Sequence, residues 1–156
     1  MVEESNSGDL DELYRETILE HSRSPHNRVS LSQADIQAEG EIPFCGDEVT
    51  VQILLDGESC IQKIGFGGKG CAISQASASM MTDLLAGKTL DQVTVLTELF
   101  RRMMLGQEVS PRELEELCDL KALLGVRKFP IRIKCALLPW TAVEEGIREH
   151  SSGSLR

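Results

Sequence analysis

Apolar positions near the N-terminus recur at helical spacing, and they are Leu10, Leu13, Tyr14, Thr17 and Ile18. Asp9 and Glu12 form a capping pair ahead of most of this stripe, which predicts a helix that starts at about Asp9 and runs to about His21. The sequence Ser-Pro-His-Asn at residues 24–27 ends the helix, because proline disfavours helical geometry in the residue before it. The pattern therefore predicts one N-terminal helix followed by a loop.

Further along, the apolar period changes to two, which is typical of strands. Four residues alternate on one face, and they are Val49, Val51, Ile53 and Leu55. A turn of Asp-Gly-Glu-Ser at residues 56–59 then leads into a second strand over 60–66, so the pattern predicts an antiparallel hairpin. A weaker strand over 36–42 is a candidate third member, although Gly40 and Pro43 count against it.

After Gly70 the apolar period returns to 3.6, which indicates helices. The first of them ends at Gly87, and a second covers about 90–105. Ser-Pro-Arg-Glu at residues 110–113 combines an N-cap, a proline in the first turn and a capping-box glutamate, which predicts a short helix over about 111–118. A last helix opens at Phe129 and Pro130. One helix, two or three antiparallel strands and four more helices give an α+β fold.

Composition limits the class of protein. With 156 residues, 41% hydrophobic and 4% aromatic, the chain has enough aliphatic material for one core, so we expect a single domain over 1–150 and a flexible tail over 151–156. The formal net charge of -9 repels phosphate backbones and anionic membrane surfaces, which argues against nucleic acid as a partner. The sequence shows neither a signal peptide nor a membrane span, and a cytoplasmic protein is expected.

Five cysteines are candidates for chemistry, because a thiol in a reducing compartment is more often a ligand, a nucleophile or a core residue than half of a disulfide. Cys45 and Asp47 lie in a turn around Gly46, Cys71 opens a helix, and Cys135 lies near the start of the last helix. Three sulfurs and one oxygen suit a tetrahedral divalent ion such as zinc. The spacing alone is not diagnostic, because no Cys-x-x-Cys knuckle is present.

Two other readings compete with a metal site. Buried cysteines often only fill space, and we expect this for Cys60 and Cys118. Residues 65–70, Gly-Phe-Gly-Gly-Lys-Gly, match the dinucleotide pattern G-x-G-x-x-G, but that pattern needs a parallel βαβ unit, whereas a hairpin precedes it here. These glycines are instead expected to allow close backbone approach around Cys71. The three histidines, His21, His26 and His150, are expected to be solvated, capping or turn residues.

Three segments together resemble the SufU/IscU/NifU N-terminal family. They are Pro-Phe-Cys-Gly-Asp at 43–47, Gly-Lys-Gly-Cys-Ala-Ile-Ser-Gln-Ala-Ser-Ala-Ser-Met-Met at 68–81, and Arg-Ile-Lys-Cys-Ala-Leu at 132–137. The resemblance covers about residues 9–148. Within the family the chain looks most like the SufU branch, because residues near 106–129 look like the insertion of that branch and Lys134 stands where IscU-type proteins have histidine. Ile42 replaces the usual Asn before the motif's proline, a departure that affects the hydrogen bonding of this loop and removes no ligand.

The resemblance implies a SufE/NifU-like fold, with a small three-stranded antiparallel sheet packed against about five helices. It implies zinc bound by Cys45, Asp47, Cys71 and Cys135, with Arg132 and Lys134 either easing the approach of anionic sulfur or serving only as surface charges. It also implies a pyridoxal-phosphate cysteine desulfurase of the SufS type as partner, and downstream cluster scaffold proteins as further candidates.

The leading hypothesis is therefore a zinc-dependent sulfurtransferase for iron-sulfur cluster assembly. Cys45 is expected to accept the persulfide sulfur, and Cys135 is the second candidate. An alternative is a scaffold that binds iron and a transient cluster on the same cysteines. A third is a structural zinc module that performs no chemistry.

Overall fold

The computed structural model describes residues 2–154, with side chains described for residues 11–153. Three strands form one antiparallel sheet in the order β1-β2-β3. The strands are β1 (Ile36–Ile42), β2 (Asp47–Leu55) and β3 (Ile61–Lys69). The predicted hairpin and the weaker third strand are both confirmed. Strand β2 lies in the middle, where Val51 pairs with Ala38 of β1 and with Phe66 of β3.

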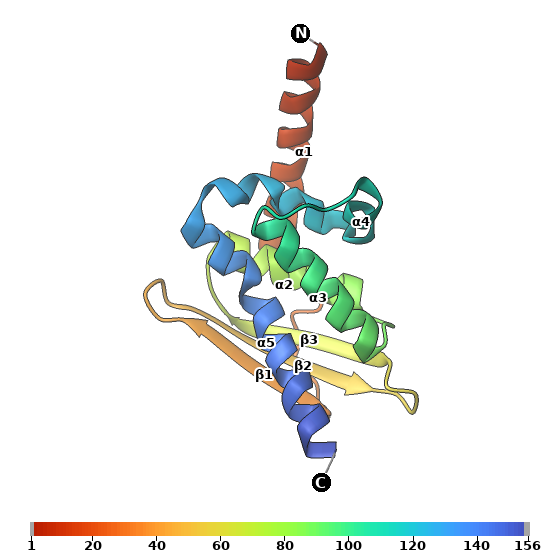
Figure 1. The fold of residues 1–156 in the computed structure, drawn as a ribbon. Coiled ribbons are helices and arrows are strands. Elements are labelled where there is room, and N and C mark those ends of the chain that lie inside the picture. Colours follow the sequence, from red (N-terminus) through yellow and green to blue (C-terminus); the bar gives the residue numbers. More distant parts are fainter. Residues whose placement is uncertain (1, 155–156) are drawn as a thin grey trace.

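Helices make up the rest of the regular secondary structure that is described (Figure 1). They are α1 (Val2–Arg23), α2 (Ala72–Leu85), α3 (Leu90–Met104), α4 (Pro111–Glu116), the 3-10 helix η1 (Cys118–Lys128) and α5 (Pro130–Ser154). The α+β class is confirmed. Within the described residues, no helix combines the length and the apolar content that crossing a membrane requires.

Three predicted boundaries differ from the structure. Helix α1 starts at Val2, so the capping pair does not mark its start, since Asp and Glu are also tolerated inside helices. Helix α4 stops at Glu116, because Cys118 adopts a φ of 51° that a helix cannot continue through, and the 3-10 helix that follows was not predicted. Helix α5 extends to Ser154, into the predicted tail, while residues 155–156 lie outside the described residues. The flexibility of that tail stays a prediction.

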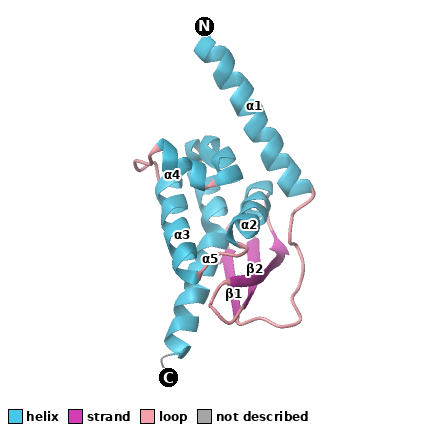
Figure 2. Ribbon diagram, turned by 90° about the vertical axis from the view of Figure 1, so that its right-hand side faces the viewer, coloured by secondary structure: helices cyan, strands magenta, loops and turns pink. Residues whose placement is uncertain are grey.

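The helices cover one face of the sheet, and the loop after α1 packs on part of the other face, where Val29 meets Gly65 and the N–H of Leu31 donates to Gln52 (Figure 2). Along β1, Ile36, Ala38 and Ile42 are buried under the helices, while the intervening Gln37 and Glu39 are exposed. This alternation follows from the period of two, which sends successive side chains to opposite faces. The apolar face is therefore the floor of a single core.

The core is closed by the only tryptophan of the chain, Trp140 of α5, which is completely buried. Its ring stacks on Phe100 of α3, with centroids 4.8 Å apart and an interplanar angle of 23°. Such offset aromatic pairs add about 0.5–1.5 kcal/mol beyond the area they bury. Helix α5 is thereby held between α3 on one side and the sheet on the other, which fixes the position of its first turns.

Gly146 shows how closely α5 lies on β1. A Cβ atom at this position would come within 2.9 Å of both Ala38 Cβ and Ile36 Cγ2. We expect Gly146→Ala to lower the free energy of unfolding by about 1–3 kcal/mol, because the added methyl group overpacks this contact. Gly153→Ala in the same helix is the control, since nothing lies within 4 Å of it and alanine favours helix there. Urea unfolding of both variants measures this, and equal stability would contradict the packing argument.

Candidate metal centre

Cys45 lies in the tight turn between β1 and β2, and its side chain is exposed. The turn is closed by the carbonyl oxygen of Ile42, which accepts hydrogen bonds from the backbone N–H groups of Cys45 (3.2 Å) and Gly46 (2.9 Å). Gly46 has a φ of 77°, a conformation that glycine adopts at no steric cost. The group that closes the turn is a main-chain carbonyl. Ile42 therefore supplies it although the family that the sequence resembles usually has asparagine at this position.

Asp47 is the first residue of β2, and only 4% of it is exposed. One carboxylate oxygen, Oδ1, accepts a hydrogen bond from the backbone N–H of Cys71 at 3.2 Å. The other oxygen, Oδ2, is buried and has no hydrogen-bond partner. An unpaired buried carboxylate oxygen is costly, because burial removes its water without replacing it. The geometry at Asp47 therefore fits a site that receives a cation.

Cys71 and Cys135 come from two helices that face this loop. Cys71 is the N-cap residue of α2, and its Sγ lies 3.9 Å from Ser74 Oγ. Cys135 lies in α5 and is buried, with 1% exposure. The carbonyl oxygen of Ala136, the next residue, accepts a hydrogen bond of 2.6 Å from Ser77 Oγ of α2. This bond ties the two cysteine-bearing helices together beside the site.

The structure brings three of the four predicted ligands to one point. The Sγ atoms of Cys45 and Cys135 and a carboxylate oxygen of Asp47 all lie within 4.8 Å of one another. Two thiols and one carboxylate fit zinc or ferrous iron, since both accept sulfur and oxygen ligands. Cys71 adjoins this group through the hydrogen bond from its backbone N–H to Asp47. Its role as a fourth ligand stays a prediction.

The surroundings of this group raise the pKa of two side chains, the thiol of Cys135 and the guanidinium of Arg132. The pKa of the Cys135 thiol is raised far above its ordinary value of 9.0, first by burial and then by the hydrogen bond to Cys71 and the charge of that residue, with Asp47 adding to the effect. The pKa of the Arg132 guanidinium is raised as well, chiefly by the charge of Cys71. Arg132 thus lies within reach of sulfur.

Two cysteines predicted to be core residues lie elsewhere. Cys118 is exposed, so that prediction is wrong, because the left-handed residue at the start of η1 turns its side chain away from the leucines beside it. Cys60 is only partly buried, where it forms an isolated bridge with Thr89. Burial, followed by the charges of Asp56 and Glu58, raises the pKa of the Cys60 thiol. Neither residue belongs to the three-ligand group.

The glycine-rich segment forms most of the second half of β3 and does not form a phosphate loop. A Cβ atom at Gly70 would lie 2.3 Å from Ser74 Oγ and 3.1 Å from Asp47 Cγ. The prediction that glycine permits close approach around Cys71 is therefore confirmed at this position. Since β3 is antiparallel to β2, the context that a dinucleotide site requires is absent from the described sheet.

His21 was expected to be solvated or capping, and this expectation is wrong, since it is 4% exposed. Its Nδ1 pairs with Ser79 Oγ at 2.7 Å, and it forms with His26 and Asp83 a second group whose ligand-type atoms lie within 4.8 Å of one another. Here His26 Nδ1 already pairs with Asp83 Oδ2 at 2.5 Å, and Asn27 Nδ2 donates to Asp83 Oδ1 at 3.1 Å. Among the residues with described side chains, this group contains no buried polar side-chain atom that lacks a hydrogen-bond partner. It differs in this from the cysteine group, where Asp47 Oδ2 has none.

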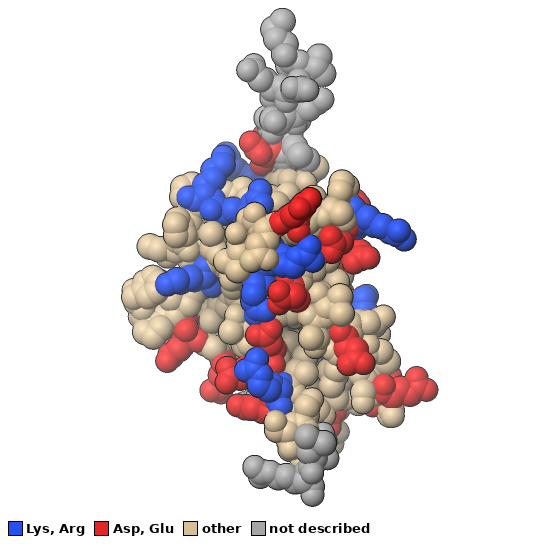
Figure 3. Space-filling view, in the orientation of Figure 1, with Lys and Arg blue, Asp and Glu red and all other residues tan. Residues whose placement is uncertain are grey.

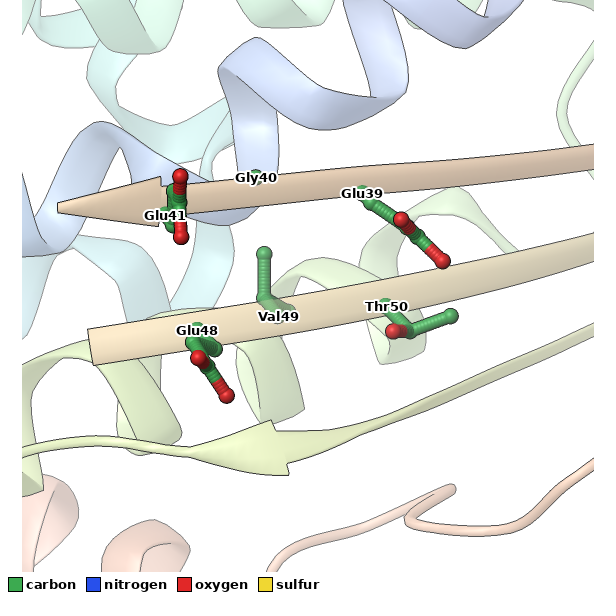
Figure 4. Close-up of a pocket in the computed structure, with 6 residues that line it drawn as sticks. All are labelled: Glu39, Gly40, Glu41, Glu48, Val49 and Thr50. Carbon is green, nitrogen blue, oxygen red and sulfur yellow. The ribbon is translucent and has the colours of Figure 1, made fainter. Parts of the chain in front are cut away.

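A hollow of about 480 Å³ on the strands lies apart from the cysteines (Figure 4). Its lining residues are Glu39, Gly40, Glu41, Glu48, Val49 and Thr50. Glu41 and Glu48 face each other across β1 and β2 as direct register partners. This acidic hollow offers no thiol, whereas Cys45, Asp47 and Cys135 converge at the end of the sheet where β1 turns into β2.

Gly70→Ala tests whether the close approach at Asp47 is needed for metal binding. The added Cβ would displace Ser74 and the Asp47 carboxylate, so we expect the affinity for zinc to fall about tenfold or more. Gly67→Ala is the control, because nothing lies within 4 Å of that position. Competition with a chromophoric chelator measures both affinities. Equal affinities would show that Asp47 does not need this geometry.

The shifted thiol can be titrated directly in the metal-free protein. An ordinary thiol is half ionised at pH 9.0, whereas Cys135 should still be protonated there because its pKa is raised. Subtracting the ultraviolet thiolate absorbance of Cys135→Ala from that of the unaltered protein should therefore give no signal at this pH. A half-developed difference signal at pH 9.0 would contradict the raised pKa.

Known proteins are similar to this chain over nearly its whole length. The chain is 39% identical over 150 residues to the zinc-dependent sulfurtransferase SufU of Bacillus subtilis, covering 96% of this chain and 99% of that protein. It is also 39% identical over 144 residues to the iron-sulfur cluster assembly scaffold protein IscU of Streptococcus pyogenes, covering 92% of this chain and 87% of the relative.

Solved structures agree with these relatives. A putative iron-sulfur cluster assembly scaffold protein for the SUF system from Fervidobacterium islandicum matches with a TM-score of 0.76 and 35% identity, covering 84% of this chain and 93% of that one. The N-terminal part of a nitrogen-fixing NifU-like protein from Brucella abortus matches with a TM-score of 0.79 and 26% identity, covering 91% and 96%. The family model of the NifU-like N-terminal domain matches residues 13–149. Because this match spans most of the chain, including Cys45, Asp47 and Cys135, this chain belongs to the NifU-like N-terminal domain family.

Proposed function

We propose that this chain is a zinc-dependent sulfurtransferase that accepts persulfide sulfur from a pyridoxal-phosphate cysteine desulfurase for iron-sulfur cluster assembly. The observation that carries the proposal is the buried, unpaired Oδ2 of Asp47 beside two converging thiols. The similarity to a zinc-dependent sulfurtransferase over 96% of the chain supports the same function. The cytoplasmic location expected from the sequence stays a prediction.

Four residues would hold the metal, namely Cys45, Asp47, Cys71 and Cys135. When bound, zinc would keep the thiols deprotonated and protect them from oxidation. Asp47 contributes an oxygen, a harder donor than thiolate, and this makes it the ligand that exchanges most easily. A hydrogen bond from the N–H of Cys71 holds the Asp47 carboxylate in place.

Cys45 is the residue we assign as sulfur acceptor, because it is exposed whereas Cys135 is buried and its thiol has a raised pKa. The thiolate of Cys45 attacks the terminal sulfur of the donor persulfide, and a new S–S bond forms on Cys45 as the donor S–S bond breaks. The electron pair leaves on the donor cysteine sulfur, which then takes up a proton. Arg132 lies close enough to the other two cysteines to balance negative charge on sulfur during this exchange.

A second function, assembly of a transient cluster on the same cysteines, is favoured by the identity of 39% to the scaffold protein IscU of Streptococcus pyogenes. The residues that would hold iron are the same. Visible absorption after reconstitution with iron and sulfide would favour this function. A structural zinc module, the third hypothesis, would show neither cluster formation nor sulfur transfer.

Cys45→Ala tests the proposed function in an assay with purified desulfurase, cysteine and a reductant. We expect the unaltered protein to stimulate sulfide release and Cys45→Ala to return the rate to that of the desulfurase alone, since the acceptor sulfur is gone. Cys118→Ala is the matched control, because it removes another exposed thiol outside the metal centre. Failure of the zinc-loaded, unaltered protein to stimulate sulfide release would refute sulfur transfer.

A further inference from the structure

The two outer strands of the sheet differ in how their outer edges are covered. In β3, the N–H of Phe66 donates to the carbonyl oxygen of Asn27 at 3.0 Å, and the carbonyl oxygen of Gly68 accepts from the Arg28 guanidinium at 2.6 Å. The loop after α1 thereby occupies part of that edge. The seven-residue strand β1, by contrast, pairs only with β2 within the described residues. Its outer edge presents N–H and C=O groups that can pair with another extended chain.

Helix α5 forms a hollow of about 410 Å³ along this open edge. The residues that line it come from β1 and α5, with none from β2, so the hollow lies on the outer side of β1. Ala38, Ala142 and Gly146 are its small members, and all three are buried. Because these residues carry little or no side chain, the hollow has room for the side chains of an added strand.

The walls of the hollow are acidic. They are formed by Glu39 of β1 and by Glu145 and Glu149 of α5, all of which are exposed. Among the side chains that the structure describes, the ion pairs leave these three carboxylates free, whereas the neighbouring Glu144 pairs with Arg148 at 3.9 Å. Acidic side chains gather at the lower left of the face in Figure 3, where Figure 1 places β1 and the lower part of α5.

The position of these carboxylates favours a positively charged occupant. Glu145 and Glu149 are four residues apart, and like charges at this spacing repel each other and destabilise a helix. The side chains of an added strand would point alternately to the two faces of the sheet. On the side of α5 they would meet Glu145 and Glu149, and on the other side they would meet Glu39 and Glu41, which line the hollow shown in Figure 4. Both faces of an added strand would therefore meet carboxylates.

We propose that the outer edge of β1 binds an extended peptide segment of a partner protein, rich in lysine or arginine, as a fourth strand of the sheet. Backbone hydrogen bonds to β1 would supply affinity, as in other cases of strand addition, and the basic side chains would supply specificity. A second copy of this chain is disfavoured as occupant, because pairing two β1 edges would oppose the carboxylates of Glu39 and Glu41 between chains that each carry a net charge of -9.

This edge is separate from the candidate metal centre. Ala38 lies four residues before the end of β1, which places it about 13 Å along the strand from the start of the turn that carries Cys45. The inference therefore goes beyond the proposed sulfur transfer and does not depend on it, and its test uses neither the desulfurase nor cysteine.

A peptide that alternates lysine with threonine over the seven-residue length of β1, acetylated and amidated at its ends, is a suitable probe. We expect it to bind the zinc-loaded protein, as measured by fluorescence anisotropy of the labelled peptide. The same peptide with N-methylated backbone amides keeps its charge but loses the donors that pair with β1, so it should bind about tenfold more weakly or worse. Equal binding of the two peptides would overturn strand addition, since charge alone would then explain the attraction.

Glu145→Gln combined with Glu149→Gln tests the acidic wall. We expect this pair to weaken binding of the lysine peptide about fivefold, because two exposed charge contacts are lost. Glu108→Gln combined with Glu116→Gln is the matched control, because both carboxylates are exposed, the change in net charge is the same and both lie next to α4, away from β1 (Figure 1). Weakening of the same size by both pairs would contradict a specific site at β1.

Hydrogen exchange followed by mass spectrometry locates the bound peptide. Binding should slow exchange of the amides in Ile36–Ile42, since their free N–H groups become paired. Protection confined to another segment would overturn the proposal. Protection of Ile36–Ile42 that rises with protein concentration in the absence of peptide would show that a second copy occupies the edge, and this result would overturn the proposal as well.

Discussion

A buried carboxylate with one unpaired oxygen organises the functional end of this molecule. Asp47 is the first residue of the central strand, where it pairs with Ile42 of β1. Its Oδ1 accepts the N–H of Cys71, and its Oδ2 is left without a partner beside the thiols of Cys45 and Cys135. Burial of a lone carboxylate oxygen opposes folding, and a bound cation removes that cost. Asp47 is therefore the residue at which we expect metal binding and folding to be coupled.

The fold supplies the three directions from which the candidate cysteine ligands approach. A tight turn delivers Cys45, the N-terminus of α2 delivers Cys71, and α5 delivers Cys135 from the layer above the sheet. Close packing holds these elements at fixed separations, as the crowding around Gly70 and Gly146 shows. Because two ligands lie on elements anchored in the core, the exposed turn carrying Cys45 is the part of the centre that a visiting protein reaches most directly.

The surface around the candidate metal centre differs from the rest of the chain in polarity and in charge. Apolar side chains and positive charges lie next to Cys45 and Cys135, in a chain whose overall charge is strongly negative. The strands β1 and β2, by contrast, carry opposed carboxylates, Glu41 and Glu48. The candidate metal ligands are thus gathered at one end of the molecule, with apolar and positively charged side chains beside them.

The order of elements and the identity of the candidate ligands could be read from the sequence, because both are local or carried by recognisable motifs. Alternation at Val49, Val51 and Ile53 predicts a half-buried strand wherever it occurs, and the segments around Cys45, Cys71 and Cys135 match a family pattern. Burial and pairing are different, since they depend on neighbours distant in sequence. Asp47 is buried because residues at the start of α2 and on α5 pack against it. His21 is buried where it pairs with Ser79 of α2. Cys118 is exposed because its left-handed backbone conformation directs its side chain away from the core. No periodicity encodes these outcomes, because each is set by packing between separate elements.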